Sequence, residues 1–264
     1  MKIAVLGARG FLGSFLCRWL NKKHIVIEVT RNILDLTDYI SVSQWLMTVQ
    51  PDAVINCAIS GGGQGIEDIS YSDVQRDLQI FLNFYNNTGG FKYINISSGA
   101  EFDRRTDIDK KPESAILLSH PLESYGFTKN TISRMVLNRD NFYNLRLFGC
   151  FDRTDPPFRL FKKFKLQQAI AVTDRYFDYI SASDFARVVD YYLQDIVLPK
   201  DINCVYEDKL LLSEQLKLFA RYHITNAEIN VIGTDNKNYT GNGQVLADLD
   251  ILLEGLIKGI KKYE

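Results

Sequence analysis

The sequence predicts an α/β fold in which a doubly wound parallel sheet carries helices on both faces, followed by a smaller part at the C-terminal end. Three observations lead to this fold. Short apolar runs of strand length alternate with segments of helical periodicity through the first half of the chain. A glycine-rich turn joins the first apolar run to the first helical segment. The alternation then weakens beyond residue 150, which predicts a change of architecture there.

The glycine turn Gly7–Gly13 follows the first strand, Ile3–Leu6, and opens a helix. Gly7 permits a tight turn, Gly10 lets a pyrophosphate approach the backbone, and Gly13 lets the helix pack against the sheet. The free N–H groups and the positive dipole end of the helix favour an anion. The spacing is G-x-x-G-x-x-G, not the usual G-x-G-x-x-G, so an ordinary strand-to-helix turn is the alternative. The place of the turn on the first strand favours a Rossmann-type dinucleotide-binding domain.

Composition narrows the class of protein. The chain has 264 residues and a net charge of −1, which argues against nucleic acid or an anionic membrane as the main partner. Four scattered cysteines without a C-x-x-C pair indicate reduced, mostly buried thiols, and three histidines without ligand spacing predict no metal site. The first strand begins at the second residue, and no apolar run approaches about 18 residues. We therefore expect a cytoplasmic protein without a leader or a membrane span.

The remaining elements of the first half follow from periodicity and from capping residues. Thr37 or Asp38 is a plausible helix cap, and Pro51 stops the helix that follows it. We expect strands at Ile25–Val29, Ala53–Ala58, Tyr93–Ile96 and Phe142–Phe148, and helices at Phe11–Leu20, Ile40–Val49 and Ile69–Tyr85.

Two arginines lie where the cofactor's ribose is recognised in such domains. Arg31 stands at the end of the second strand and Arg9 within the glycine turn, whereas Glu28 lies inside the strand. An acidic side chain at the strand end receives the ribose hydroxyls of NAD, and a basic one accommodates the 2′-phosphate of NADP. Two guanidinium groups favour the phosphate, unless both arginines are merely solvated.

A third group of chemistry-bearing residues lies between the fourth and fifth strands. Ser98 follows the fourth strand, and the charged segment Asp103–Lys111 is either a mobile active-site rim or a solvated loop. The next helix opens at Glu123 and carries Tyr125 and Lys129. These two residues are four apart, so they project from the same face of the helix.

Beyond residue 150 the basic stretch Arg159–Lys165 either meets a substrate diphosphate or packs Phe161 and Phe164 inward with its charges solvated. We expect residues 1–150 to form the dinucleotide-binding domain and residues 151–264 mainly the substrate-binding part, with segments crossing back to the sheet. The expected elements are a strand near Ile170 and helices at Ser181–Leu193, Ser213–Tyr222 and Val245–Ile260, with Ser181 or Ser183 capping the first helix and a cap at the start of the second.

Four elements together resemble the extended short-chain dehydrogenase/reductase family of nucleotide-sugar enzymes (NAD(P)-dependent epimerase/dehydratase type). They are the glycine turn, Ser98, the Tyr125–Lys129 pair and the segment Phe177–Ala186, in that order. The chain is most similar to the GDP-fucose synthases and the dTDP-4-dehydrorhamnose reductases. The resemblance implies substrate contacts at Ala100, Phe148 and Arg175, and cofactor contacts at Gly7, Arg9, Gly10, Phe11, Leu12, Gly13, Arg31, Asp35, Leu36, Cys57, Ala58, Lys129 and Leu147.

The departures from the family pattern matter as much. Family dehydratases carry an Asp-Glu pair after the catalytic serine or threonine, whereas Gly99 and Ala100 stand there in this chain. Without that acid pair, 4,6-dehydration is disfavoured. Ala100 also replaces the cysteine with which fucose synthases epimerise, and their histidine after the fifth strand is missing. The family's Arg-Asp-Phe reads Phe177-Asp178-Tyr179 here, with Arg175 displaced by two residues.

The resemblance and the residues together predict ketone reduction. Tyr125 is expected to be the acid, Lys129 to lower the Tyr125 pKa and anchor the ribose, and Ser98 to position the reacting oxygen. The leading prediction is an NADP(H)-dependent reductase of a nucleotide-linked 4-keto-6-deoxy sugar. The alternatives are an epimerase with tightly bound NAD and a non-catalytic dinucleotide-binding regulator. Similar proteins form a dimer through the Tyr125 helix and the preceding helix, so we expect a homodimer.

Overall fold

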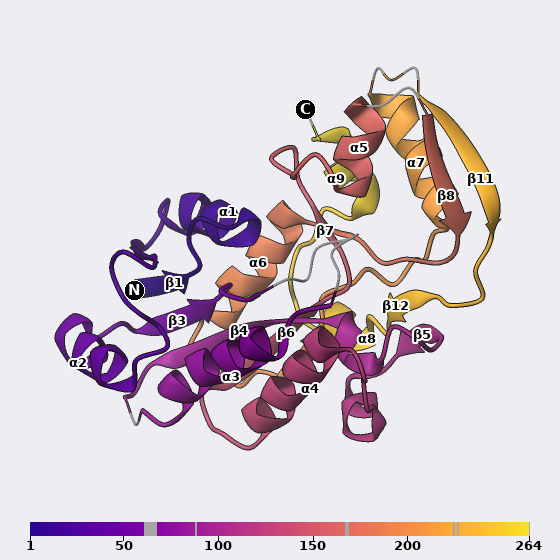
Figure 1. Cartoon of the computed structure of the whole chain (residues 1–264). Coiled ribbons are helices and arrows are strands. Elements are labelled where there is room, and N and C mark those ends of the chain that lie inside the picture. Colours follow the sequence, from indigo (N-terminus) through magenta and orange to yellow (C-terminus); the bar gives the residue numbers. More distant parts are fainter. Residues whose placement is uncertain (61–67, 88, 167–168, 224, 226, 264) are drawn as a thin grey trace.

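The computed structural model describes residues 1–60, 68–87, 89–166, 169–223, 225 and 227–263. A six-stranded sheet lies at its centre (Figure 1). Its strands are β1 (Lys2–Leu6), β2 (Ile25–Val29), β3 (Ala53–Asn56), β4 (Lys92–Ser98), β6 (Phe142–Leu147) and β10 (Asp201–Asn203). All neighbouring strands are parallel, in the order β10-β6-β4-β3-β1-β2. The chain therefore changes direction across the sheet between β1 and β3, where open α/β sheets bind ligands.

Helices cover both faces of this sheet because its buried strands are apolar on both sides. In β1, Ile3 and Val5 face one core, while Ala4 and Leu6 face the other. The first core is closed by α1 (Phe11–Leu20) and α6 (Ala182–Tyr192), and the second by α2 (Tyr39–Val49), α3 (Tyr71–Tyr85) and α4 (Ser124–Leu137). The predicted α/β fold with a doubly wound sheet is confirmed.

Most of the other elements surround a third core that is rich in aromatic side chains, while the short helix Gln244–Ala247 packs in the first core. Phe161 and Phe164 are buried in it, so the basic stretch packs its aromatic residues inward. Three short parallel strand pairs border this core: β12 with β5, β11 with β8, and β7 with β9. The elements are η1 (Gly99–Phe102), β5 (Ile108–Lys111), η2 (Glu113–Leu118), β7 (Cys150–Phe151), α5 (Leu160–Leu166), β8 (Ala169–Asp174), β9 (Ile180–Ser181), α7 (Leu212–Tyr222), β11 (Glu228–Thr234), β12 (Tyr239–Gly241), α8 (Gln244–Ala247) and α9 (Leu256–Lys261).

Several predicted boundaries are confirmed by the caps. Asp38 is the N-cap of α2 and accepts from Ile40 and Ser41, and Gln50 ends that helix in a left-handed conformation with φ of 47°. Ser181 caps α6 and accepts from the Asp184 N–H. The fourth strand is longer than predicted, since Ser98 is its last residue.

One prediction in the C-terminal part is wrong. The expected helix Val245–Ile260 is two short helices, α8 and α9. The Asp184 carboxylate accepts from the N–H groups of Glu254 and Gly255, at 2.9 Å each, and Gly255 has φ of 84°. These contacts hold the intervening chain away from helical geometry. The predicted capped helix Ser213–Tyr222 is α7: the Glu214 carboxylate accepts from the Leu211 N–H at its start, at 2.8 Å, and the Ser213 hydroxyl donates to Asp174 at 2.7 Å.

The cysteines, the metal-binding residue types and the helix lengths also bear on the sequence predictions. Cys17, Cys150 and Cys204 are buried free thiols, and Cys57 is a half-buried one. Within the described ranges, no three His, Cys, Asp or Glu side chains gather as a metal site requires. None of the described helices is both long enough and apolar enough to span a membrane.

Candidate active site

The glycine turn is built as a phosphate-binding element requires. Gly7 has φ of 71°, and a Cβ there would lie 2.8 Å from the Ala58 backbone nitrogen. A Cβ on Gly13 would lie 2.2 Å from the Gly7 carbonyl oxygen, so the start of α1 packs directly on the turn. Gly10 is exposed, and α1 begins after it without a side-chain cap among the described residues. Its first N–H groups therefore face outward at the positive end of the helix, where an anion is stabilised.

A cavity of about 800 Å³ opens beside this turn, between the carboxyl ends of β1 and β3. Its volume suits a cofactor-sized ligand. Eight of the expected cofactor residues line it: Gly7, Arg9, Gly10, Arg31, Asp35, Leu36, Cys57 and Ala58. The residues present thus fit a nicotinamide dinucleotide, with glycines at the expected pyrophosphate position and two arginines at the expected ribose position.

The cavity also contains residues that the sequence patterns did not single out. Arg76 and Asp77 reach it from α3. Asp77 accepts from the Ser60 N–H and hydroxyl, at 2.9 and 2.8 Å, while Arg76 contacts the same hydroxyl and pairs with Asp73. No periodicity distinguishes these two residues from the solvated face of a helix, so their role depends on tertiary structure alone.

The other expected cofactor residues are not among those that line the cavity. Phe11, Leu12 and Gly13 form the first turn of α1, behind the glycine turn. Leu147 is buried at the end of β6 and pairs in register with Ser98 of β4.

Ser98 occupies the end of β4, where the strand gives way to η1. Its hydroxyl caps this short helix by accepting from the Ala100 N–H at 3.3 Å. The Ser98 side chain also interacts with Tyr125 and lowers its pKa, and the Ser98 hydroxyl lies 3.4 Å from the Tyr239 hydroxyl. The predicted Ser98–Tyr125 pair therefore comes together, and a second tyrosine accompanies it.

The start of α4 is held in place by Asp68. Its carboxylate accepts from the N–H groups of Ser124 and Tyr125, at 2.6 and 3.0 Å. Partial burial opposes the charge, yet these hydrogen bonds keep the pKa of Asp68 below its ordinary value. Asp68 thus satisfies N–H groups that a helix start leaves free, and it fixes the turn that carries Tyr125.

The environment of Tyr125 differs from the expected one. Burial raises its pKa above the ordinary value, while the hydrogen bond from Ser98 and the charge of Arg104 oppose that rise. The Arg104 guanidinium lies 5.7 Å from the centre of the Tyr125 ring and pairs with Glu123 at 2.6 Å. Arg104 belongs to the charged segment after η1, and that segment includes β5 as well as a turn.

Lys129 lies one helical turn from Tyr125 and is buried. Its ammonium donates to the Ile96 carbonyl at 2.5 Å and lies 6.0 Å from the centre of the Tyr125 ring. Burial lowers the pKa of Lys129 to about 8. The lowering of the Tyr125 pKa by Lys129 stays a prediction, since burial makes the net shift of the Tyr125 pKa upward and the ammonium is bonded to the strand carbonyl.

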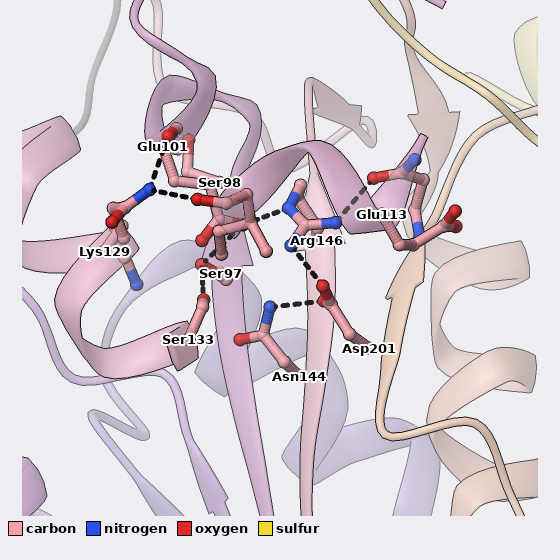
Figure 2. A network of polar contacts seen from close by, with 12 residues as sticks. Ser97, Ser98, Glu101, Glu113, Lys129, Ser133, Asn144, Arg146 and Asp201 are labelled. Atoms are coloured by element: carbon pink, nitrogen blue, oxygen red, sulfur yellow. Dashed lines mark hydrogen bonds and ion pairs between the residues drawn. The ribbon is translucent and has the colours of Figure 1, made fainter. Parts of the chain in front are cut away.

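A buried polar network supports β4 and β6 behind Ser98 (Figure 2). Arg146 of β6 is fully buried and contacts the Glu101 carboxylate, Asp201 at 2.6 Å and Asn203 at 2.8 Å. Burial raises the pKa of Glu101 to about 7, although Arg146 opposes the rise. Glu101 follows the two positions where family dehydratases carry acids, but its carboxylate points into this network.

The wall next to Ser98 is aromatic, and it leaves no room for a side chain at position 99. A Cβ on Gly99 would lie 2.5 Å from the Phe148 ring, and one on Gly241 would lie 2.7 Å from the same ring. The Phe148 ring therefore packs directly against the backbone at both Gly99 and Gly241. Ala100 is buried against Tyr125 in a small apolar cluster.

Arg175 stands farther from the reacting groups. It pairs with Asp235 at 3.4 Å, and its guanidinium lies 5.6 Å from the centre of the Phe177 ring. That ring packs against Tyr239, with 5.0 Å between centroids. The Phe177 and Tyr239 rings thus lie between Arg175 and Ser98.

Comparisons with known proteins agree with this geometry. The model of the NAD dependent epimerase/dehydratase family matches residues 3–204. Protein CapI of Staphylococcus aureus is 26% identical in an alignment 234 residues long, which covers 75% of this chain and 67% of that protein.

Solved structures share the fold at low sequence identity. A dTDP-4-dehydrorhamnose reductase from Clostridium acetobutylicum has a TM-score of 0.79 at 20% identity, with coverage of 100% of this chain and 98% of that chain. A GDP-mannoheptose C4 reductase from Campylobacter jejuni with NADP bound has a TM-score of 0.75 at 19% identity, with coverage of 99% and 96%. The Bordetella bronchiseptica enzyme WbmG, in complex with NAD and UDP, has a TM-score of 0.76 at 17% identity, with coverage of 98% and 92%.

The family match spans more than half of the chain and includes the glycine turn, Ser98, Tyr125 and Lys129. It confirms the resemblance drawn from the sequence, and with it a nicotinamide-dinucleotide enzyme. The chain belongs to the NAD dependent epimerase/dehydratase family.

Proposed function

We propose that this protein is an NADP(H)-dependent reductase of a 4-keto-6-deoxy sugar linked to a nucleoside diphosphate. One observation carries the proposal. Ser98 interacts with Tyr125, and the acid pair of the family dehydratases is replaced by Gly99, which has no room for a side chain, and Ala100. The set that remains can transfer a proton to a carbonyl oxygen, and it lacks the acids that dehydration uses.

Each site residue would have a separate role in the reduction of a ketone. The bound dinucleotide supplies a hydride to the carbonyl carbon. Tyr125 donates its proton to the carbonyl oxygen, and burial favours the protonated phenol that this step needs. Ser98 donates a hydrogen bond to the same oxygen as negative charge develops. Lys129 contributes a positive charge near the Tyr125 ring and, as the resemblance implies, anchors the ribose.

The preference for NADP rests on Arg9 and Arg31. Both are exposed at the cavity, and Arg31 follows the end of β2. Guanidinium groups bind phosphate oxygens bidentately, so two of them favour a 2′-phosphate over ribose hydroxyls. Asp35 lies on the same wall as a carboxylate, because hydrogen bonds from Thr37 lower its pKa.

The sugar and its nucleotide belong to the part of the chain beyond residue 150, where we place the substrate-binding part. Phe148 and Ala100 stand next to Ser98 and Tyr125, and Arg175 is the candidate for the substrate diphosphate. Two of the similar structures described above are nucleotide-sugar reductases, which supports the substrate class.

An absorbance assay tests the proposal. NADPH oxidation is followed at 340 nm with dTDP-, GDP- and CDP-linked 4-keto-6-deoxy sugars, for the wild type and for Tyr125→Phe. We expect turnover with at least one sugar and a loss of about 10²- to 10⁴-fold in Tyr125→Phe, the usual contribution of a positioned acid. Absence of turnover with every sugar would contradict the proposal.

A nucleotide-sugar epimerase with tightly bound NAD is the second candidate, since WbmG is recorded with NAD and UDP. Protein purified with NAD(H), and without affinity for NADP(H), would favour it. The third candidate, a non-catalytic regulator, would gain support if Tyr125→Phe left every measurable activity unchanged.

We also propose a homodimer through α3 and α4. Phe127 of α4 is 49% exposed, and Tyr71 at the start of α3 is 76% exposed. Analytical ultracentrifugation should give a dimer for the wild type and a monomer for Phe127→Glu. A monomeric wild type at micromolar concentration would remove this proposal.

A further inference from the structure

Tyr239 is a second phenol at the candidate reaction centre, and it comes from a distant part of the chain. It begins β12, which lies beside β5, and its hydroxyl lies 3.4 Å from Ser98 Oγ. Neither the glycine turn nor the Tyr125–Lys129 spacing points to it. Its place next to Ser98 arises only from the fold.

The ring of Tyr239 is held firmly. It packs on Phe148 and Phe177, with centroid distances of 5.1 and 5.0 Å. Its N–H donates to the Tyr176 carbonyl at 2.9 Å, and its carbonyl accepts from the Asp178 N–H at 3.1 Å. The side chain is only 8% exposed. The direction of its hydroxyl is therefore fixed by backbone pairing and by aromatic packing.

The Ser98 hydroxyl can form only a limited number of hydrogen bonds, so its contact with Tyr239 affects where its own proton can point. A serine hydroxyl has one proton and two acceptor lone pairs. The Ala100 N–H occupies one lone pair at 3.3 Å. Burial raises the pKa of Tyr239, so its phenol keeps its proton, and among the described residues Ser98 is the partner found for this hydroxyl. A buried hydroxyl donates where an acceptor is available, and the second lone pair of Ser98 is an acceptor within reach of the Tyr239 proton.

We propose that Tyr239 is a positioning residue of the reductase site, whose hydroxyl donates to Ser98 Oγ and so directs the Ser98 proton toward Tyr125 and the reacting oxygen. With both lone pairs of Ser98 occupied, its proton has one direction left. The chain of donors runs from Tyr239 to Ser98 to Tyr125. It stabilises the phenolate that Tyr125 becomes after it has given up its proton.

The effects of Tyr239 on the reaction kinetics rest on the proposed function. In the reductive direction Tyr125 must be protonated, so the rate falls as pH rises through its pKa. Removing the Tyr239 hydroxyl weakens the stabilisation of the phenolate. Tyr239→Phe should therefore move the alkaline limb of the kcat profile upward by about 1 pH unit and lower kcat about tenfold, with little change in KM.

A double-mutant cycle tests whether Tyr239 acts through Ser98. Tyr239→Phe, Ser98→Ala and the double variant are compared with Tyr263→Phe, a matched control. Tyr263 lies in the same aromatic core, but its hydroxyl contacts Asp155. We expect the alkaline limb to shift in both single variants and to shift no further in the double variant. An equal additional shift in the double variant, or an unshifted limb in Tyr239→Phe, would overturn the proposal.

A spectroscopic measurement separates this inference from the proposed reaction. The ultraviolet absorbance of tyrosinate is titrated in NADP-saturated protein, and the Tyr125 contribution is the difference from Tyr125→Phe. Its midpoint should rise in Tyr239→Phe and stay unchanged in Tyr263→Phe. If no ketosugar is reduced but this midpoint moves, the proposed reaction fails and the positioning role stands. An unmoved midpoint overturns the role whatever the activity, and thermal melts exclude unfolding as the cause.

Discussion

The proposed role of Lys129 comes with an energetic cost to the fold. Its ammonium is buried, and the hydrogen bond to the Ile96 carbonyl, the one found for it among the described residues, does not replace the water that a lysine normally holds. Burial accordingly lowers its pKa to about 8. An anionic ligand in the neighbouring cavity would offset this cost, so binding and the charge of Lys129 are linked.

The stability of the ligand-free protein should reveal that cost. A lysine in the unfolded chain titrates near 10.4, so between about pH 8 and 10.4 the unfolded state binds more protons than the folded state. Wild-type stability should rise across this window relative to Lys129→Met, by up to about 3 kcal/mol. Urea unfolding at several pH values measures the difference. Lys163→Met, at an exposed position of α5, should show no such trend; a flat difference for Lys129→Met would contradict the argument.

Arg31 permits a second test at the scale of single residues. Replacing it with alanine removes a guanidinium from the cavity wall without disturbing the core, because the side chain is exposed. Arg31→Ala should weaken NADPH binding about tenfold or more and leave NADH binding nearly unchanged, since only NADPH carries the 2′-phosphate. Calorimetric titration with both cofactors measures this. Arg18→Ala, on the outer face of α1, is the control, and equal losses for both cofactors would refute the assignment.

Among the elements, the junction of β4 and η1 is the most constrained. Gly99 faces the Phe148 ring at a distance that no Cβ tolerates, and Gly241 closes on the ring from another side. Gly99→Ala should therefore destabilise the protein by about 1–3 kcal/mol, as overpacking does. Gly90→Ala, with nothing within 4 Å of the new Cβ, should change the stability by less than about 0.5 kcal/mol. Chemical denaturation compares the two variants.

A rescue makes this test sharper. Phe148→Leu vacates part of the space, so Gly99→Ala should cost less in the Phe148→Leu background than in the wild type. The same cost in both backgrounds would show that Phe148 does not restrict position 99.

The sequence predicts elements well where local signals and packing agree. The apolar runs at β1, β3 and β4 are buried on both sides, and Asp38 and Ser181 cap their helices as their residue types suggest. Predictions from the sequence fail where tertiary contacts determine whether a helix or a strand forms. Asp184 interrupts the expected C-terminal helix, and the short strand β10 joins the sheet by tertiary pairing with β6.

The residues of the candidate site also fall into those that local sequence signals predict and those that only the tertiary structure brings to the site. Ser98, Tyr125 and the arginines lie in motifs whose spacing is local, so they could be predicted. Asp68 and Tyr239 could not, because each comes from a segment with no motif of its own, whereas Arg104 lies in the charged segment for which an active-site rim was one of two interpretations.

At the scale of the whole molecule, the buried network around Arg146 joins the two parts of the chain. Arg146 lies on β6 and contacts Glu101 after β4, together with Asp201 and Asn203 of β10. Asn203 in turn donates to the carbonyls of Lys111 and Asn242, at 2.9 and 3.1 Å. The strand that comes from beyond residue 150 is thus fastened to the central sheet by charge as well as by backbone pairing.

Removing Arg146 should therefore affect both stability and cooperativity. Arg146→Leu leaves two buried carboxylates without their cation, which typically costs about 3–5 kcal/mol. Because the lost contacts link β10 to the sheet, we also expect the single urea transition to broaden or to split, with a smaller m-value. Arg139→Leu is the matched control, since the Arg139 guanidinium contacts only the carbonyls of Tyr85 and Asn87 and the Tyr85 and Phe142 rings among the described residues. It should lower stability without changing the m-value. An Arg146→Leu protein that unfolds in one transition with the wild-type m-value would show that the two parts are held together by apolar packing alone.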